Sequence, residues 1–366
     1  MKVLQIIPTF GVAGAEKVVL NYLKYNQSDT MHIKAISLYP SQNSMYDQEI
    51  AAKGLDVTYL HKGHGFDISV VKELKNAIKQ YNPDVIHTHL YALKYLLLTG
   101  EMKNRKIFHT IHNQPDKDVG KLDELINRYC FRKSKVIPVT LQDELAAEVN
   151  NYYGVTNTKV IKNGIPLQEY NKKNNELYKE LNIKRDTFII GHIGRFSWQK
   201  NHDFIINIFE QIQKDNKNTC LLLIGSGGEE QRIRSLVEEK GIGEHVRFLG
   251  NRSDIAELLN IMNVFFFPSR YEGLGIVLIE AQAANVPCVV STAIPEEVLL
   301  TPKIKRLDLK DSTQKWEETL LHPEIIHENQ LHGRLQDYDI VKILLGLEEM
   351  YKGCLLYTSP SPRDRG

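Results

Sequence analysis

Residues 268–280 read Pro-Ser-Arg-Tyr-Glu-Gly-Leu-Gly-Ile-Val-Leu-Ile-Glu, so two carboxylates, Glu272 and Glu280, lie eight positions apart. The apolar run Val264–Phe267 just before this stretch is typical of a strand, and the segment after the glycines is typical of a helix that enters a core. A carboxylate on such a helix needs a partner, because an unpaired buried charge costs free energy. The stretch therefore predicts a strand, a Gly-containing loop and a helix that carry a polar site.

Two interpretations of this site fit the residues. In the first, backbone N–H groups ahead of the helix bind phosphate and the two carboxylates hold sugar hydroxyls, which suggests a nucleotide-sugar site. In the second, Glu272 lies near a helix start because the helix dipole favours it there, and Glu280 forms a salt bridge. The stretch taken alone does not decide between them.

Strand-like apolar runs alternate with amphipathic helical stretches along the whole chain, in two rounds separated by the polar stretch Pro166–Asp186. This alternation predicts parallel sheets covered by helices on both faces. We expect an α/β protein with two doubly wound, Rossmann-like domains at 1–165 and 166–336, followed by a helix at 337–353. Ligands should lie at the carboxyl ends of the strands, in a cleft between the domains. The predicted strands are Val3–Ile7, His32–Leu38, Val57–Leu60, Val85–His87, Lys106–Ile111, Val136–Val139, Phe188–Ile193, Cys220–Ile224, Val246–Leu249, Val264–Phe267 and Pro287–Ser291.

The composition is that of an ordinary globular protein, with 42% hydrophobic and 25% charged residues in 366. The net charge of +1 conceals an asymmetry, because residues 1–165 carry 21 Lys and Arg against 16 Asp and Glu. The window Lys94–Lys135, with ten basic and five acidic residues, accounts for that excess. This window could contact an anionic membrane or an acidic acceptor, or it could be a solvated surface. We expect no nucleic-acid partner.

The remaining features of composition point to the cytoplasm. Cys220 and Cys288 lie in apolar runs and lack metal-site spacing, which favours core thiols in a reducing compartment. The first residues predict a strand and no signal peptide, and no apolar run is long enough to span a membrane. We expect a cytoplasmic protein, with the inner face of the cell membrane as a possible place of action. Residues 354–366 break from the preceding pattern and are expected to be a non-native tail, a genuine disordered tail being the alternative.

Glycine-rich turns and cations follow several predicted strands. Gly11 and Gly14 after the first strand lack the full G-x-G-x-x-G fingerprint, and no acidic residue ends the second strand, which weakens a dehydrogenase interpretation. In the second half, Gly194 and Arg195 follow a strand, and Lys200 precedes a helix expected near 201–210. Two cations beside a helix start favour a diphosphate clamp, and an ordinary charged surface loop is the alternative.

Six motifs, taken in order, resemble the retaining glycosyltransferases of family four, known as group 1, which have the GT-B fold; the resemblance covers roughly residues 1–350 and is closest to enzymes that make bacterial capsular or exopolysaccharide. The motifs are Gly14-Ala-Glu16, Asn163-Gly-Ile165, Gly194-Arg195 with Lys200, Ile224-Gly-Ser-Gly227, Phe248-Leu-Gly250, and Pro268–Glu280 with Pro287. One departure is Pro166, where many members of the family have aspartate.

The resemblance implies a role for each matching residue. Arg195 and Lys200 would hold the diphosphate and stabilise its growing charge, Glu272 would face the donor sugar, and His112 would line the cleft near that sugar. His109 is a competitor for the last role, and a structural histidine is the alternative for both. The implied donor-binding residues are Gly14, Gly225, Gly250, Gly273, Leu274, Gly275, Ile276 and Glu280, the last of them on the ribose. The resemblance implies no cofactor and no metal.

The function implied is transfer of a sugar, with retention, from a nucleotide sugar, with uridine the expected base, to a saccharide or lipid-linked saccharide in surface polysaccharide synthesis. Two alternatives stay open. A nucleotide-sugar 2-epimerase of the same fold would release a free epimer without an acceptor. An inactive nucleotide-sugar-binding protein would do no chemistry, although the presence of Arg195, Lys200, Glu272 and Glu280 argues against it.

Overall fold

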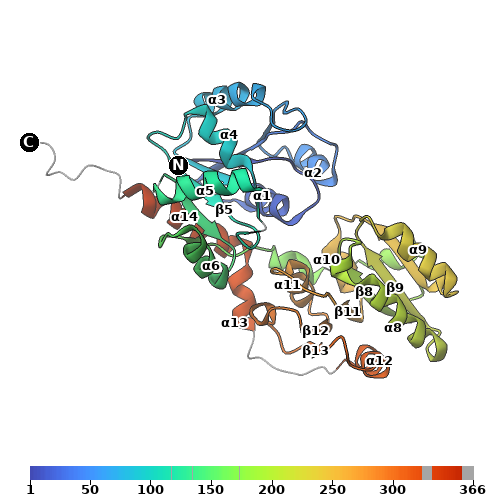
Figure 1. The fold of residues 1–366 in the computed structure, drawn as a ribbon. Coiled ribbons are helices and arrows are strands. Elements are labelled where there is room, and N and C mark those ends of the chain that lie inside the picture. The colour runs from blue at the N-terminus through green and yellow to red at the C-terminus, as the bar shows by residue number, and fades with distance from the viewer. Residues whose placement is uncertain (117, 134, 173, 324–331, 357–366) are drawn as a thin grey trace, which may run out of the picture. The chain divides into compact units, whose positions relative to one another are not determined.

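The computed structural model describes residues 1–356 except 117, 134, 173 and 324–331. The expected tail lies outside these residues from 357 onward, whereas 354–356 continue a helix. The chain forms two compact units, drawn in Figure 1. Unit 1 contains Met1–Ile165 and the described residues from Tyr338 onward, and unit 2 is Pro166–Asp337.

Unit 1 is built on a seven-stranded parallel sheet in the order β3-β2-β1-β4-β5-β6-β7. The strand order reverses between β1 and β4, as in a doubly wound fold. The chain first adds β2 and β3 on one side of β1 and then adds β4 to β7 on the other side. The strands are β1 (Lys2–Ile7), β2 (His32–Ser37), β3 (Val57–Tyr59), β4 (Val85–His89), β5 (Lys106–Thr110), β6 (Ile137–Thr140) and β7 (Lys159–Val160). The helices are α1 (Gly14–Tyr25), α2 (Met45–Lys53), α3 (Ser69–Tyr81), α4 (Ala92–Thr99), α5 (Lys121–Arg132), α6 (Asp143–Tyr153) and α14 (Ile340–Leu356).

Alternate residues of these strands face opposite layers of helices, since side chains in a strand alternate between the two faces. Leu4, Ile86 and Ile107 pack with apolar residues of α3 to α6 on one face. Val3, Val85 and Phe108 belong to a second cluster on the other face, which α1 and α14 cover. Both faces of the sheet are therefore buried, which explains its nearly continuous apolar strands.

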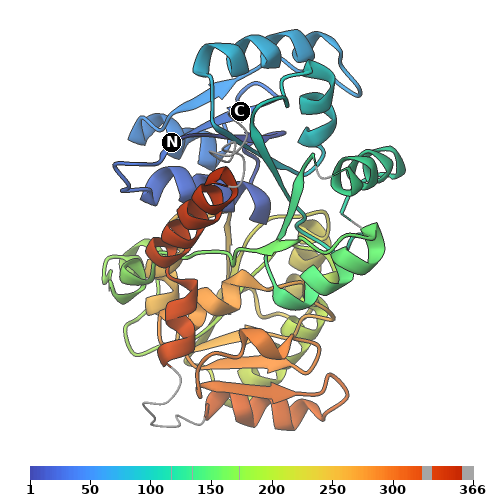
Figure 2. The same cartoon turned by 90° about the vertical axis from the view of Figure 1, so that its left-hand side faces the viewer.

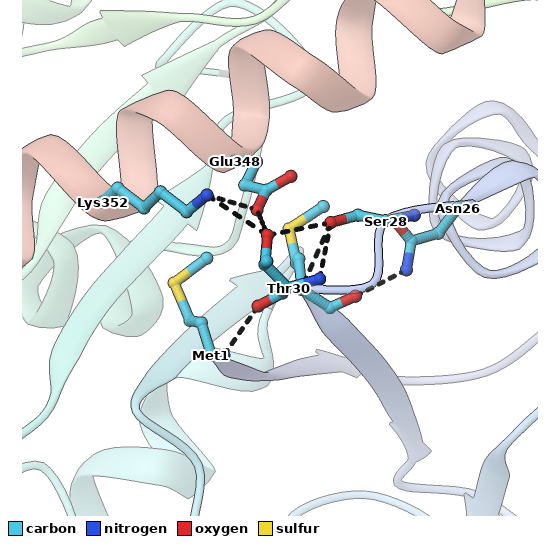
Figure 3. Close-up of polar contacts among 7 residues, drawn as sticks. Met1, Asn26, Ser28, Thr30, Glu348 and Lys352 are labelled. Atoms are coloured by element: carbon cyan, nitrogen blue, oxygen red, sulfur yellow. Dashed lines mark hydrogen bonds and ion pairs between the residues drawn. The ribbon is translucent and has the colours of Figure 1, made fainter.

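Helix α14 returns the chain from unit 2 to unit 1, and Figures 1 and 2 both draw it (red) beside the blue N-terminal elements. Its apolar side buries residues that include Leu347 and Tyr351. At its far end the Lys352 ammonium contacts Glu348 across 2.6 Å and donates to the Thr30 hydroxyl across 3.2 Å, and Thr30 also contacts Glu348 (Figure 3). Lys352 and Thr30 lower the pKa of the Glu348 carboxyl to about 2. Apolar packing and this polar contact together attach the helix to unit 1.

The chain leaves and re-enters unit 1 at one point. Ile165 N donates to Tyr338 O across 2.8 Å, and Ile340 N donates to Ile165 O across 3.0 Å. A Cβ on Gly164 would lie 2.8 Å from the Cα of Ile340, so only glycine permits this close approach.

Unit 2 is built on a six-stranded parallel sheet in the order β10-β9-β8-β11-β12-β13. Helices cover both faces, and the largest cluster includes Phe209 of α8, Ile233 of α9 and Trp316 of α12. The strands are β8 (Phe188–Ile193), β9 (Thr219–Ile224), β10 (Val246–Gly250), β11 (Val264–Phe267), β12 (Cys288–Ser291) and β13 (Ile304–Leu307). The helices are α7 (Leu177–Glu180), α8 (His202–Asp215), α9 (Glu230–Glu239), α10 (Ile255–Asn260), α11 (Ile276–Ala283), α12 (Thr313–Leu321) and α13 (His332–Leu335). Short 3-10 turns are η1 (Leu167–Asn171), η2 (Trp198–Lys200), η3 (Gly243–His245), η4 (Glu296–Val298) and η5 (Gln336–Tyr338).

Two doubly wound parallel sheets confirm the predicted fold class. Cys220 and Cys288 are buried, and burial raises the pKa of the Cys220 thiol to about 11 and that of Cys288 further still. No helix within the described ranges has the length and apolar character needed to cross a bilayer.

Candidate active site

The carboxyl ends of β8, β9 and β10 lie side by side in unit 2 and are joined by backbone hydrogen bonds. Gly194 N donates to Ile224 O across 2.9 Å, and Gly225 N donates to Gly250 O across 2.8 Å. The glycines that the sequence singled out after three separate strands therefore form one continuous rim. Their adjacency follows from the strand order, because the ends of parallel strands meet at one edge of the sheet.

Gly225 makes this rim compact. Its φ of +131° is a conformation that other residues rarely adopt, and a Cβ there would lie 2.2 Å from the Gly194 carbonyl oxygen. Gly225 is thus required by the backbone itself, whatever ligand the rim binds.

Lys200 and Glu272 form an ion pair beside the rim. Lys200 Nζ lies 2.6 Å from Glu272 Oε1, with 14% and 5% of the two side chains exposed. Lys200 Nζ also lies 4.7 Å from the centre of the Phe267 ring, and Gln199 Nε2 donates to Glu272 Oε2 across 3.4 Å. The sequence assigned these two residues separately, one to the diphosphate and one to the sugar, and the structure brings them into direct contact.

Arg195 is the exposed cation of this edge. Gly194 alone separates it from β8, and within the described part of the chain its guanidinium has no acidic partner. Two neighbouring positions keep the local backbone free of side chains. A Cβ on Gly273 would meet no protein atom within 4 Å, and Gly275, with φ +67°, is the residue from which α11 begins at Ile276. Leu274, between the two glycines, is partly exposed in the same loop.

Glu280 lies on α11 and is partly exposed, so it is less buried than its apolar neighbours suggested. The Tyr170 hydroxyl donates to Glu280 Oε1 across 2.7 Å. Tyr170 belongs to η1, in the polar stretch that sequence reasoning treated as a connection between domains. The Glu280 carboxylate therefore has a phenol as one of its hydrogen-bond partners.

Sequence reasoning also missed a pair of histidines beneath the same loop. His192 Nδ1 donates to Phe266 O across 2.9 Å, and His202 stacks on Phe196 with ring centres 4.2 Å apart. Burial lowers the pKa of both rings, that of His202 to about 4, so they are neutral near pH 7. The sequence signal that could have identified this pair is His192, an imidazole inside the otherwise apolar strand Phe188–Ile193.

Gly14 and His112 belong to unit 1. Gly14 is the first residue of α1, and a Cβ on it would meet no protein atom within 4 Å. His112 follows β5, and its Nε2 lies 3.1 Å from Nδ1 of His89. Burial lowers the pKa of His112 to about 4. Its competitor, His109, is fully buried on the opposite face of the sheet with Thr88, which leaves His112 as the partly exposed ring.

The described residues contain no cluster of three or more His, Cys, Asp or Glu side chains arranged to hold a metal ion. The positive charge at the carboxyl edge of unit 2 comes from Arg195, from Arg270, whose guanidinium lies 4.9 Å from the centre of the Trp198 ring, and, within its ion pair, from Lys200. An arrangement of this kind can bind an anionic group such as a diphosphate and stabilise charge that develops on it.

Comparison with known proteins agrees with this architecture. Residues 12–169 match the family model of Glycosyltransferase Family 4, and residues 173–306 match that of Glycosyl transferases group 1. The chain is 27% identical to the putative glycosyltransferase EpsF of Bacillus subtilis, over 87% of this chain and 86% of EpsF. It is 24% identical to CapH of Staphylococcus aureus, a capsular polysaccharide biosynthesis glycosyltransferase, over 87% and 90% of the two chains.

A solved structure gives the same fold. Anabaena HepE, crystallised in complex with UDP-glucose, superposes with a TM-score of 0.78 at 18% identity, over 96% of this chain and all of HepE. The two family models together span most of the chain, and they match its two units in the order that the sequence motifs predicted. The chain therefore belongs to the family-four glycosyltransferases and is an enzyme of the GT-B fold.

Proposed function

We propose that this glycosyltransferase moves a sugar from a uridine-diphosphate sugar to a saccharide or lipid-linked saccharide during assembly of a surface polysaccharide, with retention of configuration at the anomeric carbon. The observation that carries the proposal is the edge of unit 2 where Arg195 and the Lys200–Glu272 pair lie beside the rim of strand ends. The similarity to CapH, a capsular polysaccharide biosynthesis glycosyltransferase, supports the polysaccharide, and the similarity to HepE, crystallised with UDP-glucose, supports the uridine nucleotide.

The proposed chemistry follows from the charges at this edge. As the bond between the anomeric carbon and the diphosphate breaks, negative charge grows on the leaving oxygen. Arg195 and Lys200 would stabilise that charge, and the resident cations would make a bound metal unnecessary for departure. Glu272 and Glu280 would accept hydrogen bonds from donor hydroxyls and would not act as a glycosidase acid and nucleophile.

The direct test is incubation of the purified protein with UDP-sugars, with and without candidate saccharide acceptors, followed by NMR of the anomeric protons. Transfer that preserves the donor's anomeric configuration, and persists after chelation with EDTA, is the expected result. Release of a free epimer from the donor alone would instead identify a 2-epimerase. Binding of the donor without any product would identify an inactive binding protein.

We further propose that helix α5 brings the enzyme to an anionic membrane surface at the cytoplasmic face. Leu122, Leu125 and Tyr129 are 63%, 61% and 49% exposed along one side of this helix, and basic side chains flank them. An apolar row bordered by cations fits the interface of an anionic bilayer. Lys135 is the exposed cation in contact with this row, with its ammonium 5.2 Å from the centre of the Tyr129 ring. Lys121, Arg132 and Lys133 are exposed cations of the same segment.

Sedimentation with vesicles tests this part. The protein should pellet with vesicles rich in phosphatidylglycerol at low salt, and a Leu122→Ser, Leu125→Ser double variant should stay in solution. Equal pelleting with neutral and anionic vesicles would remove the membrane from the proposal and leave the transfer reaction untouched.

A further inference from the structure

A chain of hydrogen bonds runs through unit 1 from helix α14 to His112. Tyr351 of α14 accepts from Gln5 Nε2 across 3.2 Å, and Gln5 Oε1 accepts from His89 Nε2 across 2.9 Å. His89 Nδ1 lies 3.1 Å from His112 Nε2. A side branch joins the Tyr351 hydroxyl to His87 Nδ1 across 2.6 Å.

Strand register places these residues in one row. Gln5 of β1 pairs with His87 of β4, and His89 of β4 pairs with Thr110 of β5. All four side chains point to the face of the sheet that α14 covers, since they share the parity of Phe108 and Val85. His87 and His89 stack with ring centres 4.7 Å apart, and Tyr351 packs on Phe108 at 5.0 Å. The series of hydrogen bonds is therefore formed by side chains on one face of the sheet and by the helix that covers that face.

The orientation of the Gln5 amide sets the direction of each hydrogen bond in this series. Gln5 donates through its nitrogen to Tyr351, so its oxygen must accept from His89 Nε2–H. A neutral His89 then carries a lone pair on Nδ1, which accepts from His112 Nε2–H. Nδ1 of His112 is left as the acceptor of a partly exposed ring.

The histidines of this row are neutral, which makes the directional argument possible. Burial is the main cause that lowers the pKa of His87, His89 and His112, and the neighbouring imidazoles lower those of His87 and His89 further. A neutral imidazole has one donor and one acceptor nitrogen, so fixing one fixes the other.

Gln5 is the residue at which the direction of these hydrogen bonds could reverse. Turning its amide by half a turn would exchange donor and acceptor at both ends, and His112 would then carry its proton on Nδ1. Tyr351 couples that reversal to a second histidine. While its hydroxyl accepts from Gln5, the hydroxyl proton is free for His87 Nδ1, 2.6 Å away, and His87 Nε2–H then faces the Thr110 hydroxyl across 2.7 Å. Reversal at Gln5 would therefore require His87 to change tautomer as well, which opposes it.

We propose that Tyr351, acting through Gln5 and His89, holds His112 in the tautomer with the proton on Nε2 and the lone pair on Nδ1, so that His112 accepts a hydrogen bond from a donor-sugar hydroxyl. Tyr351, Gln5 and His89 are positioning residues for this role. The use of the lone pair rests on the proposed function; the tautomer itself does not.

Long-range proton–nitrogen NMR of histidine-labelled protein reads the tautomer directly. The His112 ring, assigned by comparison with His112→Gln, should show a protonated Nε2 in the wild-type protein. Tyr351→Phe and, independently, Gln5→Met should each give a mixture of tautomers at His112. Tyr95→Phe is the matched control, because Tyr95 is equally buried in unit 1 and its hydroxyl accepts from Asp67 N, outside this series of hydrogen bonds, so the variant should leave the spectrum unchanged.

Kinetics complete the test. Tyr351→Phe should lower kcat about fivefold, the factor expected for one lost hydrogen bond, with little change in the KM of the nucleotide sugar. A proton on Nδ1 of His112 in the wild type would overturn the inference, and so would a Tyr351→Phe protein with an unaltered His112 spectrum. Absence of sugar transfer by a wild-type protein with the expected spectrum would overturn the proposed function and support the assigned tautomer.

Discussion

Lys200 Nζ and Glu272 Oε1 lie 2.6 Å apart in a contact largely shielded from water. Two opposite charges at this distance present little net charge to a ligand, so the net positive charge at the neighbouring strand ends comes mainly from Arg195 and Arg270. The pair is better understood as one unit that fixes both side chains than as two independent binding groups. Removing either partner leaves the other charge uncompensated, which costs more than the pair contributes.

Glu272→Gln should therefore reduce sugar transfer and stability together. We expect kcat/KM to fall by about 100-fold, the size typical of one lost charge-stabilising contact, and thermal unfolding to occur at lower temperature. Lys240→Met is the matched control, since Lys240 forms a 2.6 Å ion pair with Glu210 elsewhere in unit 2. Wild-type kcat/KM in Glu272→Gln would exclude Glu272 from the active site.

Arg195→Gln should lower sugar transfer without lowering the stability of the fold. Because the side chain is exposed, its loss should leave the midpoint of thermal unfolding unchanged. Transfer should fall by about 100-fold in kcat/KM, because a fixed cation no longer meets the diphosphate. Arg185→Gln, another exposed arginine of unit 2, should behave as wild type in steady-state kinetics. Equal activity of the two variants would contradict the diphosphate assignment.

Tyr170→Phe removes the phenol that donates to Glu280. One lost hydrogen bond to a carboxylate corresponds to about fivefold in affinity, so the dissociation constant of the nucleotide should rise by about that factor in calorimetric titration. Tyr178→Phe, in the neighbouring α7, supplies the control. If nucleotide affinity is the same in both variants, Tyr170 does not orient Glu280 for binding.

Gly225→Ala should disrupt the rim through its backbone. A Cβ at this position would approach the Gly194 carbonyl oxygen to 2.2 Å in a φ region unfavourable to alanine, so unit 2 should unfold at a clearly lower urea concentration. Gly228→Ala, three residues on, meets no atom within 4 Å and should unfold as the wild type does. Matching urea midpoints in the two variants would refute the steric argument.

Acid should destabilise the fold before its carboxylates titrate. Burial lowers the pKa of His109 to about 3 and those of His112 and His202 to about 4, whereas in the unfolded chain they titrate near 6.5. Between these values the unfolded chain binds more protons than the folded one, so stability is complete above pH 6.5 and is lost as pH falls toward 4. The free energy of unfolding, measured in urea at pH 7.5 and pH 5, should be lower at pH 5.

Two carboxyls oppose this trend. Burial raises the pKa of Glu16, and it raises that of Asp118 to about 6, so the folded chain binds these protons first and gains stability from them as pH falls. The buried histidines outnumber these two carboxyls, and His109→Gln should flatten the pH dependence. His61→Gln, at a largely exposed side chain, should leave the dependence as it is. A free energy of unfolding that does not change between pH 7.5 and pH 5 would contradict the argument.

The sequence predicted the sheets because their strands are buried on both faces and therefore read as continuous apolar runs. Phe188–Ile193 and Val264–Phe267 are strands with the predicted bounds. Two of the four edge strands, β7 and β13, were missed for the converse reason. Lys159–Val160 and Ile304–Leu307 are short, carry charges and pair on one side only, so no apolar run marks them.

At the site, the sequence identified residues by motif but not by contact. Arg195 and Lys200 follow strand β8, and Glu272 follows strand β11. These two strands are neighbours in the sheet, so the residues lie close together, but the sequence does not give this strand order. Tyr170 gave no signal, because its stretch is polar and its partner lies 110 residues away. The return of α14 to unit 1 was equally invisible, since an amphipathic helix carries no mark of the surface that it covers.

The hydrogen-bonded crossing at Ile165 and Tyr338 gives the chain an order of assembly during translation. Unit 2 is one continuous segment and can fold on the ribosome as soon as it emerges. Unit 1 appears first, yet it must wait for α14, made about 170 residues later, to cover its exposed sheet face. In the nascent chain Phe108 and its apolar neighbours therefore stay open to water, and to chaperones, until α14 has been synthesised.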